Sequence, residues 1–305
     1  MKLFGGHIRG SKKIACVAMV LTFAMLLAGC GKSVSALSEK EQAETGKRVI
    51  ALSESNAELW ILAGGTLVGT SEDALDVEGL NPDSQNLGDM DHVSLEAIAA
   101  LEPELLILFE TDPAQKALGE AAQEVGIPVV FTNIDGYADY EKVMKEFTDL
   151  TGREDLYEKN VVQVRDSIDS VVSKVPENAE PKTYLLLHVS ATKSKAEKND
   201  YFASEIFNNL GLENIASDEG AFNELSMEAI VNADPDYIFV VPRGDEAKAL
   251  ESFGDIFESD PAWQSLSAVK NGRYILLDKD LFGLKPNAQW GEAYEEAYNT
   301  VYGAQ

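Results

Sequence analysis

The sequence predicts an α/β protein of two lobes, each built on a parallel β-sheet, with one long α-helix joining them. Three observations support this prediction. Short apolar runs alternate with amphipathic stretches in two separate series, which is typical of parallel strands connected by helices. Between the series, residues 154–175 have apolar side chains at helical spacing and no strand pattern. A segment of the first series also recurs in the second.

The first series begins with a strand at residues 49–52, an uninterrupted apolar run. Residues 53–56 (SESN) provide a turn and a polar cap for a helix that continues to residue 63. A polar loop separates the second strand from Ser94, which caps the next helix. The remaining elements predicted in this series are strands at 67–70, 105–109 and 128–131, and helices at 94–101 and 113–125.

The connecting segment is predicted to be one helix because Gly152 ends the preceding helix and Pro176 follows the last apolar position. At 1.5 Å per residue its 154–175 span would be about 33 Å long. A rod of this kind limits how far two lobes can hinge. The second series then contains strands at 184–188, 237–241 and 274–277, and helices at 201–210, 226–232, 246–258 and 288–302.

The composition excludes several classes of protein. Of the 305 residues, 45% are hydrophobic, which is normal for a globular chain and argues against wholesale disorder. Acidic residues outnumber basic ones by 52 to 25, giving a formal net charge of −27. Binding to duplex DNA or RNA needs a clustered excess of Lys and Arg, so we expect no nucleic-acid partner. The charge also favours a soluble monomer.

The N-terminus has the pattern of an export signal. Basic residues at 2, 9, 12 and 13 precede an uncharged run at 14–29, which is too short to span a membrane as a helix. The run ends in Leu-Ala-Gly-Cys, with the cysteine at position 30, and this resembles the bacterial lipoprotein cleavage box. An ordinary signal with an incidental cysteine remains the alternative. We therefore predict a signal at 1–29, a flexible tether at 30–46 from lipidated Cys30, lobes at 47–152 and 177–305, and an interlobe helix at 153–176.

The internal repeat relates residues 93–109 to residues 225–241. In each copy a serine precedes a helix and a glutamate follows two residues later, giving the pairs Ser94/Glu96 and Ser226/Glu228. A carboxylate in the first turn of a helix is stabilised by the helix dipole and needs no partner. Convergence of two helix–turn–strand units would explain part of the similarity.

Taken in order along the chain, these motifs resemble the long-helix substrate-binding proteins of ABC transporters that deliver ferric siderophores, haem or cobalamin. The resemblance covers residues 47–305. It rests on the lipoprotein box, the Ser-x-Glu helix followed by Pro-[Glu/Asp] and a strand in both lobes, the connecting helix, and the stretches 260–273 (DPAWQSLSAVKNGR) and 285–294 (KPNAQWGEAY). It implies two Rossmann-like lobes with the ligand cleft between them, and a protein that performs no catalysis and carries no cofactor.

The resemblance also implies partners. In that family one glutamate per lobe, placed as Glu96 and Glu228 are, docks onto arginines of the permease dimer, which works with an ATPase. Arg–carboxylate pairs supply directional hydrogen bonds. A lipid anchor at Cys30 would hold the protein at the outer face of the cell membrane, where it would capture an iron chelate or a tetrapyrrole.

Pockets in open α/β folds form beyond the carboxyl ends of strands, so loop residues at those ends are the ligand-binding candidates. Arg243 directly follows a strand and suits an anionic chelate, although a solvated loop arginine is an equal alternative. Phe222 and Phe282 could stack on a flat ligand. One histidine from each lobe, His92 and His188, could ligate haem iron with help from Tyr201. The remaining loop candidates are Ser55, Asn56 and Lys285.

Other chemistry has little support. Only His92 and His188 lie outside the signal, and Cys30 would be lipidated, so too few nitrogen and sulfur ligands remain for a zinc site and we predict no resident metal. No phosphate-loop, dinucleotide-binding or nucleophile-elbow motif is present in the sequence. The alternatives from other classes are a secreted α/β hydrolase and a surface adhesin, and an enzyme would require a clustered acid–base group in one lobe.

Overall fold

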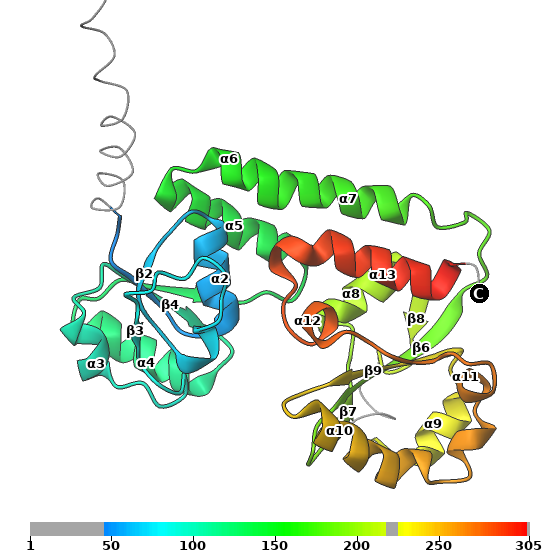
Figure 1. Cartoon of the computed structure of the whole chain (residues 1–305). Coiled ribbons are helices and arrows are strands. Elements are labelled where there is room, and N and C mark those ends of the chain that lie inside the picture. The colour runs from blue at the N-terminus through cyan, green and yellow to red at the C-terminus, as the bar shows by residue number, and fades with distance from the viewer. Residues whose placement is uncertain (1–45, 218–224, 304–305) are drawn as a thin grey trace, which may run out of the picture. The chain divides into compact units, whose positions relative to one another are not determined.

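A computed structural model describes residues 46–217 and 225–303 of the chain. The predicted signal, the tether up to residue 45 with Cys30, and the candidate Phe222 lie outside the described residues. Residues Lys47–Gln305 form one compact unit, which consists of two α/β lobes (Figure 1). The predicted fold class is therefore confirmed.

The N-terminal lobe is a parallel sheet with the strand order β3-β2-β1-β4-β5. Its central strands, β1 (Val49–Ala51) and β4 (Leu105–Phe109), lie in the lobe's interior, as their unbroken apolar runs predict. A polar side chain caps each of the next three helices, from Ser53, Ser94 and Asp112. The other elements are α2 (Glu54–Leu62), β2 (Leu67–Thr70), η1 (Glu72–Ala74), β3 (Gln85–Asn86), α3 (Leu95–Ala100), α4 (Pro113–Glu124), β5 (Val129–Thr132) and α5 (Tyr137–Thr151).

The C-terminal lobe has the strand order β10-β9-β6-β7, with β8 pairing to the first part of β6. All of these pairs are parallel except β6 with β7, a short antiparallel ribbon that the sequence analysis missed along with β8. The elements are β6 (Lys182–Val189), β7 (Ser194–Ala196), α8 (Phe202–Asn209), β8 (Leu212–Asn214), α9 (Met227–Ala233), β9 (Tyr237–Pro242), α10 (Glu246–Phe253), η3 (Gly254–Glu258), η4 (Trp263–Ser265), α11 (Ser267–Lys270), β10 (Tyr274–Leu276), α12 (Lys279–Phe282), η5 (Asn287–Gln289) and α13 (Trp290–Tyr302).

The helical connection between the lobes is continuous but not uniform. It consists of α6 (Glu154–Tyr157), a π-helical segment η2 (Glu158–Val162) and α7 (Gln163–Val172), so it ends three residues earlier than predicted. The π segment loosens the backbone hydrogen bonding, and two tyrosines of α5 satisfy the carbonyls there. Tyr140 Oη donates to Asn160 O at 2.8 Å and Tyr137 Oη donates to Val161 O at 2.5 Å. The helix is thereby fixed to the N-terminal lobe.

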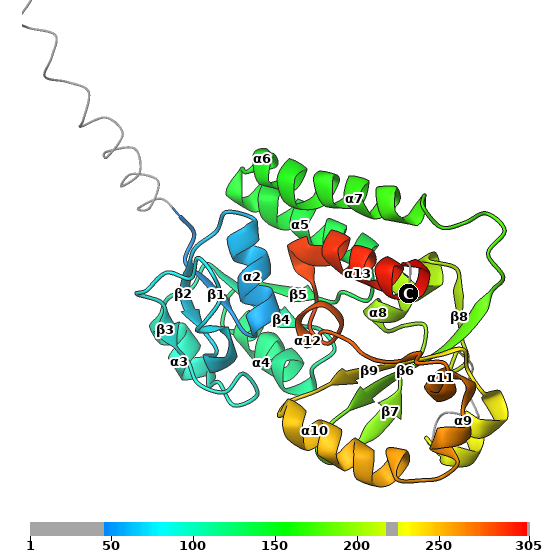
Figure 2. The same cartoon turned by 45° about the vertical axis from the view of Figure 1, so that its right-hand side comes forward.

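A second helix strengthens this connection. The C-terminal helix α13 lies alongside α7 in both cartoon views (Figures 1 and 2). Its first residue, Trp290, is fully buried, with its ring edge-on to Tyr137 of the N-terminal lobe at 5.8 Å and to Phe202 of the C-terminal lobe at 5.9 Å. One apolar core therefore runs without interruption from β1 and α2 through α7 and α13 to β6 and β9.

The repeat detected in the sequence is also a repeat of hydrogen bonds. Ser94 and Ser226 each accept from a backbone N–H three residues later, at 3.2 Å in both copies. Glu102 and Asp234 both adopt positive φ, 46° and 40°, at the turn after the helix. Glu104 and Asp236 then each accept from a backbone N–H at the start of their lobe's first strand, 2.9 Å from Arg48 N and 3.0 Å from Thr183 N.

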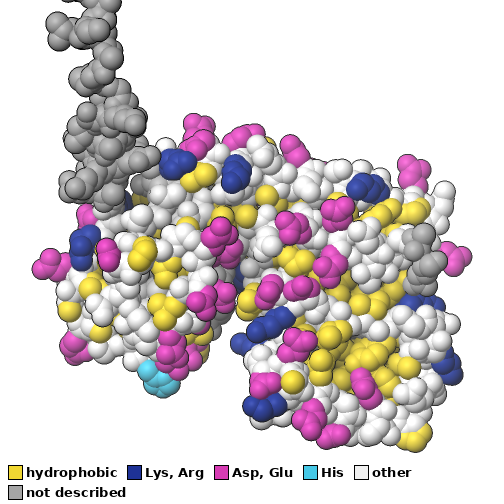
Figure 3. Space-filling model, viewed as in Figure 1, with side chains coloured by type: hydrophobic (Ala, Val, Ile, Leu, Met, Phe, Trp, Pro, Cys, Tyr) yellow, Lys and Arg dark blue, Asp and Glu magenta, His cyan; other side chains and the backbone are white. Residues whose placement is uncertain are grey.

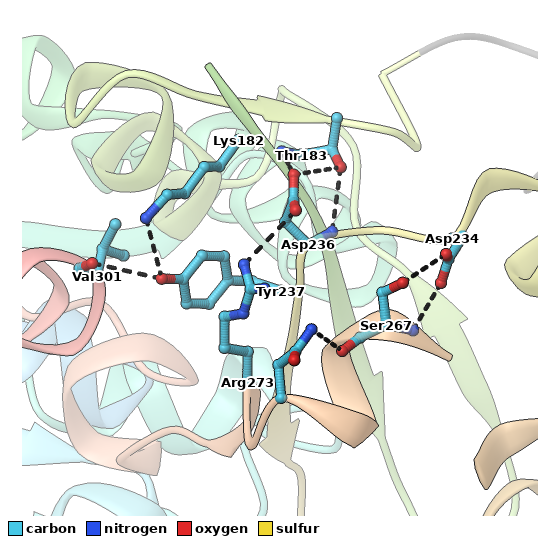
Figure 4. Close-up of polar contacts among 9 residues, drawn as sticks. Lys182, Thr183, Asp234, Asp236, Tyr237, Ser267, Arg273 and Val301 are labelled. Atoms are coloured by element: carbon cyan, nitrogen blue, oxygen red, sulfur yellow. Dashed lines mark hydrogen bonds and ion pairs between the residues drawn. The ribbon is translucent and has the colours of Figure 1, made fainter. Parts of the chain in front are cut away.

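The hydrogen bond from Thr183 N to Asp236 joins the second copy of the repeat to β6, a central strand of its sheet (Figure 4). Asp236 also accepts from the Thr183 hydroxyl at 3.3 Å and lies 3.5 Å from the Arg273 guanidinium. Asp234, at the preceding turn, accepts from both the backbone N–H and the hydroxyl of Ser267 at 2.7 Å, which fixes the start of α11. The acidic residues around Pro235 are therefore structural.

We expect Asp236→Ala to lower the free energy of unfolding by about 1–3 kcal/mol, because the partly buried Thr183 N–H would lose its acceptor. Urea denaturation of the purified chain measures this loss. Asp200→Ala is the matched control, since Asp200 is an exposed aspartate of the same lobe. Equal midpoints for the two variants would contradict the structural role.

Candidate functional site

A cleft of about 850 Å³ lies between the lobes, and both lobes contribute to its walls. Four strands bring their carboxyl ends to this lining: Ser53 follows β1, Phe109 ends β4, His188 lies near the end of β6 and Arg243 follows β9. This is the position that open parallel sheets favour for ligands. In the space-filling view the surface is hollowed between the lobes, with acidic side chains along one edge and basic side chains on the facing edge (Figure 3).

The N-terminal wall is built on a tight turn after β1. Ser53 has a φ of 94°, a conformation that costs energy for a residue with a side chain. Hydrogen bonds hold it there: Ser53 N donates to Ser71 Oγ at 2.7 Å, and Glu54 N donates to Asp73 Oδ2 at 2.9 Å. The turn aims the start of α2, including Ser55, at the cleft.

Two carboxyl groups of α2 have raised pKa values, because their surroundings disfavour the ionised form. Burial raises the pKa of Glu54, and the nearby carboxylates of Asp73 and Asp280 raise it further. Burial also raises the pKa of Glu58, although a hydrogen bond from Asn287 Nδ2 at 2.5 Å opposes the shift. Both residues line the cleft and lie one helical turn apart. The N-terminal wall therefore has an excess of negative charge, which Lys279 offsets only in part at Glu54.

The C-terminal wall contains a fixed histidine. His188 is 8% exposed, and its Nδ1 lies 2.9 Å from Glu197 Oε1, which also accepts from Lys195 Nζ at 2.9 Å. Burial raises the pKa of Glu197, but the hydrogen bonds from His188 and Lys195 outweigh this and lower it below the usual value. An ionised carboxylate can only accept, so Nδ1 is the donor. His188 Nε2 is buried and has no partner among the described residues.

Two further predicted residues line the cleft beside His188. The Tyr201 ring lies 5.4 Å from the His188 ring, and its hydroxyl donates to Phe282 O at 2.6 Å. Burial raises the pKa of Tyr201, which keeps it protonated. Lys285 extends over the Phe202 ring and donates to Ile134 O, so it links the lobes across the cleft floor. Burial lowers the pKa of Lys285.

The structure brings Ser55, His188, Tyr201, Arg243 and Lys285 to one cleft, as the loop positions predict. It corrects three of the other candidates. Phe282 is fully buried and stacks on Phe207 with ring centroids 5.9 Å apart, so it has no free face for a ligand.

The second correction concerns Asn56. This residue is also fully buried, and its side chain is an internal strut. Its amide donates to Leu52 O at 3.1 Å and accepts from the Thr132 hydroxyl at 2.7 Å. His92 is not part of the cleft lining either, since its side chain is 80% exposed and lies 3.5 Å from Asp89. The sequence shows only that each candidate follows a strand, and not which way its side chain points.

Several cleft residues were not singled out from the sequence. Glu197 reaches His188 only through the β6–β7 ribbon, for which the sequence contains no clear signal. Lys279 lies on the short helix α12, which was not predicted. Glu54 and Glu58 had a usable signal, because their spacing of four residues places both on one face of α2.

The two Ser-x-Glu helices lie apart from the cleft. Glu96 of α3 and Glu228 of α9 are both exposed, and each follows a serine that caps its helix. In both cartoon views α3 and α9 occupy the ends of the two lobes on the side away from α7 (Figures 1 and 2).

Comparisons with known proteins agree with this fold. The periplasmic binding protein family model matches residues 49–281. Two relatives from Bacillus subtilis are an Fe(3+)-citrate-binding protein, 24% identical, and an iron(3+)-hydroxamate-binding protein, 27% identical; each alignment covers 88% of this chain and 90% of the relative. The crystal structure of Staphylococcus aureus IsdE complexed with heme shares the fold, with a TM-score of 0.72 and 16% identity over 84% of this chain and 99% of that one.

The chain therefore belongs to the periplasmic binding protein family. This confirms the family resemblance drawn from the repeat and the connecting helix, and the hydrolase and adhesin alternatives are not favoured. The relatives are named as binding proteins rather than enzymes. Within residues 46–217 and 225–303, the search for a helix long and apolar enough to cross a membrane finds none.

The raised pKa of Glu58 predicts how the stability of the protein depends on pH. Because its folded pKa is raised, the folded protein binds more protons than the unfolded chain at pH values between the ordinary glutamate pKa of about 4.3 and the raised value. Stability from this group therefore falls as the pH rises through that window. We expect Glu58→Gln, which keeps an acceptor for Asn287, to be more stable than the wild type at pH 7, with a smaller difference at pH 4.

Urea denaturation at the two pH values measures this difference. Glu146→Gln is the control, since Glu146 is an exposed glutamate of α5 outside the cleft. A Glu58→Gln protein that is less stable than the wild type at pH 7 would contradict the assignment.

Proposed function

We propose that this protein is the extracytoplasmic solute-binding component of an ABC importer, and that it captures a siderophore-like iron chelate in the cleft between its lobes. The observation that carries the proposal is the cleft itself. Its volume of about 850 Å³ lies within the range of small-molecule sites, and residues from both lobes converge on it. The two iron-chelate-binding relatives support the choice of ligand class.

A tetrapyrrole is the second candidate, and one observation favours it. Within the part of the chain that the structure describes, His188 Nε2 has no partner, and Glu197 holds the ring in a fixed orientation. An imidazole supported in this way can act as a ligand for iron. Haem, or cobalamin through its central metal, would then be oriented by His188.

The remaining parts of the proposal concern delivery. Cys30 would be lipidated after removal of the signal, and residues 31–46 would tether the binding unit to the membrane over about 20–25 Å of coil. The monomeric binding protein would dock on the permease through Glu96 and Glu228, and the associated ATPase would drive import. Complementary charge would orient the docked protein.

The ligand class can be tested with the purified chain. We expect a thermal-shift screen to find one ferric chelate that raises the melting temperature, since a ligand at 100 times its Kd stabilises a protein by about 2.7 kcal/mol. The panel contains ferric hydroxamate, ferric catecholate, ferric citrate, haem and cobalamin, with each iron-free chelator as a control. Haem binding would also shift the Soret absorbance. No shift with any ferric compound or tetrapyrrole would refute the proposed function.

The docking role makes a separate prediction. We expect Glu96→Ala combined with Glu228→Ala to leave chelate affinity unchanged and to reduce uptake of radioactive iron by cells at least about tenfold, because two charge-assisted contacts would be lost. The matched control is Glu124→Ala with Glu251→Ala, which removes one exposed helical glutamate from each lobe. Uptake that remains at the wild-type rate in the first double variant would remove the docking assignment.

A further inference from the structure

The two walls of the cleft have opposite charge. The N-terminal lobe contributes five carboxylates to the lining and no basic residue: Glu54, Glu58, Asp73, Asp76 and Glu78. The C-terminal lobe contributes four basic residues and two carboxylates: Lys195, Arg243, Lys279, Lys285, Glu197 and Asp280. The described lining is therefore negative on one wall and positive on the other.

The fold uses part of the positive charge but little of the negative charge. Lys195 is paired with Glu197, and Lys285 donates to a backbone carbonyl across the cleft floor. Among the described residues, none of the five N-terminal carboxylates forms an ion pair. Burial and the carboxylates of Asp73, Asp280 and Asp76 raise the pKa of Glu54, and Lys279 opposes this shift only in part. A positive group placed against this wall would relieve that repulsion.

A second, independent observation indicates that a ligand occupies this space. His188 lines the same cleft and is only 8% exposed, and its Nε2 has no hydrogen-bond partner among the described residues. Ser55, on the opposite wall, has a buried hydroxyl that also lacks a partner within residues 46–217 and 225–303. Buried polar atoms normally have partners, so two such atoms on facing walls are expected to meet polar groups of a bound molecule.

We propose that the cleft selects a metal chelate that carries a positively charged group, and that this group lies against the N-terminal wall formed by Glu54, Asp73 and Asp76. The inference rests on the proposed function and narrows it to a class of chelate. Oxygen-rich or anionic groups of the same ligand face Arg243 and Lys279 on the other wall. A polyanionic chelate such as ferric citrate is disfavoured, because the lining carries seven carboxylates against five basic residues once Lys159 of the π segment is included.

Three chelates with the same iron centre and terminal groups of different charge test this selectivity. The probes are a linear ferric trihydroxamate with a terminal ammonium group, its N-acetylated neutral form and its N-succinylated anionic form. We expect the Kd, measured by calorimetry at low ionic strength, to increase about fivefold at each step from the cation to the anion. The preference should shrink in 0.5 M NaCl, where screening is stronger.

Substitutions then locate the selectivity on the N-terminal wall. Asp73→Asn with Asp76→Asn keeps an acceptor for Glu54 N and should reduce the preference for the cation over the anion at least about fivefold. Asp83→Asn with Glu120→Gln is the control, because it removes two exposed carboxylates of the same lobe that do not line the cleft. The control should keep the wild-type preference.

Each of the other results would contradict either the charge selectivity or the proposed function. Equal affinities for the three probes, or a preference for the anion, would overturn the inference and leave the proposed function intact. Equal loss of affinity for all three probes in Asp73→Asn with Asp76→Asn would show that the walls attract each other during closure, which also overturns it. Binding of another chelate from the panel but of none of these probes overturns the inference alone, whereas no binding of any chelate refutes the function itself.

Discussion

The two lobes depend on one apolar core that continues from one to the other beneath the cleft. Trp290 occupies its centre, edge-on to Tyr137 on one side and to Phe202 on the other. Around it the same cluster of buried residues contains strand residues of both sheets, including Val49 and Tyr184. Opening the lobes widely would expose this core to water, at a free-energy cost of about 25 cal/mol for each Å² of apolar surface exposed. The cleft therefore has a fixed floor, and its closure is expected to be a small movement of walls about that floor.

The connecting helix contains its π segment, Glu158–Val162, where it contacts α5. Tyr140 and Tyr137 of α5 donate to the carbonyls of Asn160 and Val161 within this segment. The same turn places Lys159 on the cleft lining. One local irregularity therefore contributes both to the joint between the lobes and to the lining of the cleft.

Much of the scaffold is predictable because local chemistry determines it. The buried strands are unbroken apolar runs, and the helices begin at Ser94 and Ser226 because each side chain caps its own backbone. The repeat could be aligned by sequence because the positive φ at Glu102 and Asp234 and the acidic acceptors after each proline are needed in both copies.

The cleft is less predictable because its residues come together through tertiary contacts. Strand-end position correctly indicates His188 and Arg243, but it also indicates Asn56 and Phe282, whose side chains turn into the interior. The partner of His188 depends on an antiparallel ribbon of three residues, β7, which is too short to produce a clear alternating pattern. Sequence position fixes which loops surround a site, whereas side-chain direction is decided by packing.

The two lobes share their structural residues but differ in the charged residues that line the cleft. Structural residues recur in both lobes, but the cleft lining does not: acids follow β1 and β2 in the first lobe, whereas Arg243 follows β9 in the second. In a chain with a net charge of −27, the long-range field attracts cations and repels anions. The basic wall can therefore act only at short range, on a ligand already inside the cleft. The net charge of the whole molecule would therefore govern the approach of the ligand. The difference in charge between the two walls would govern its orientation once it is inside the cleft.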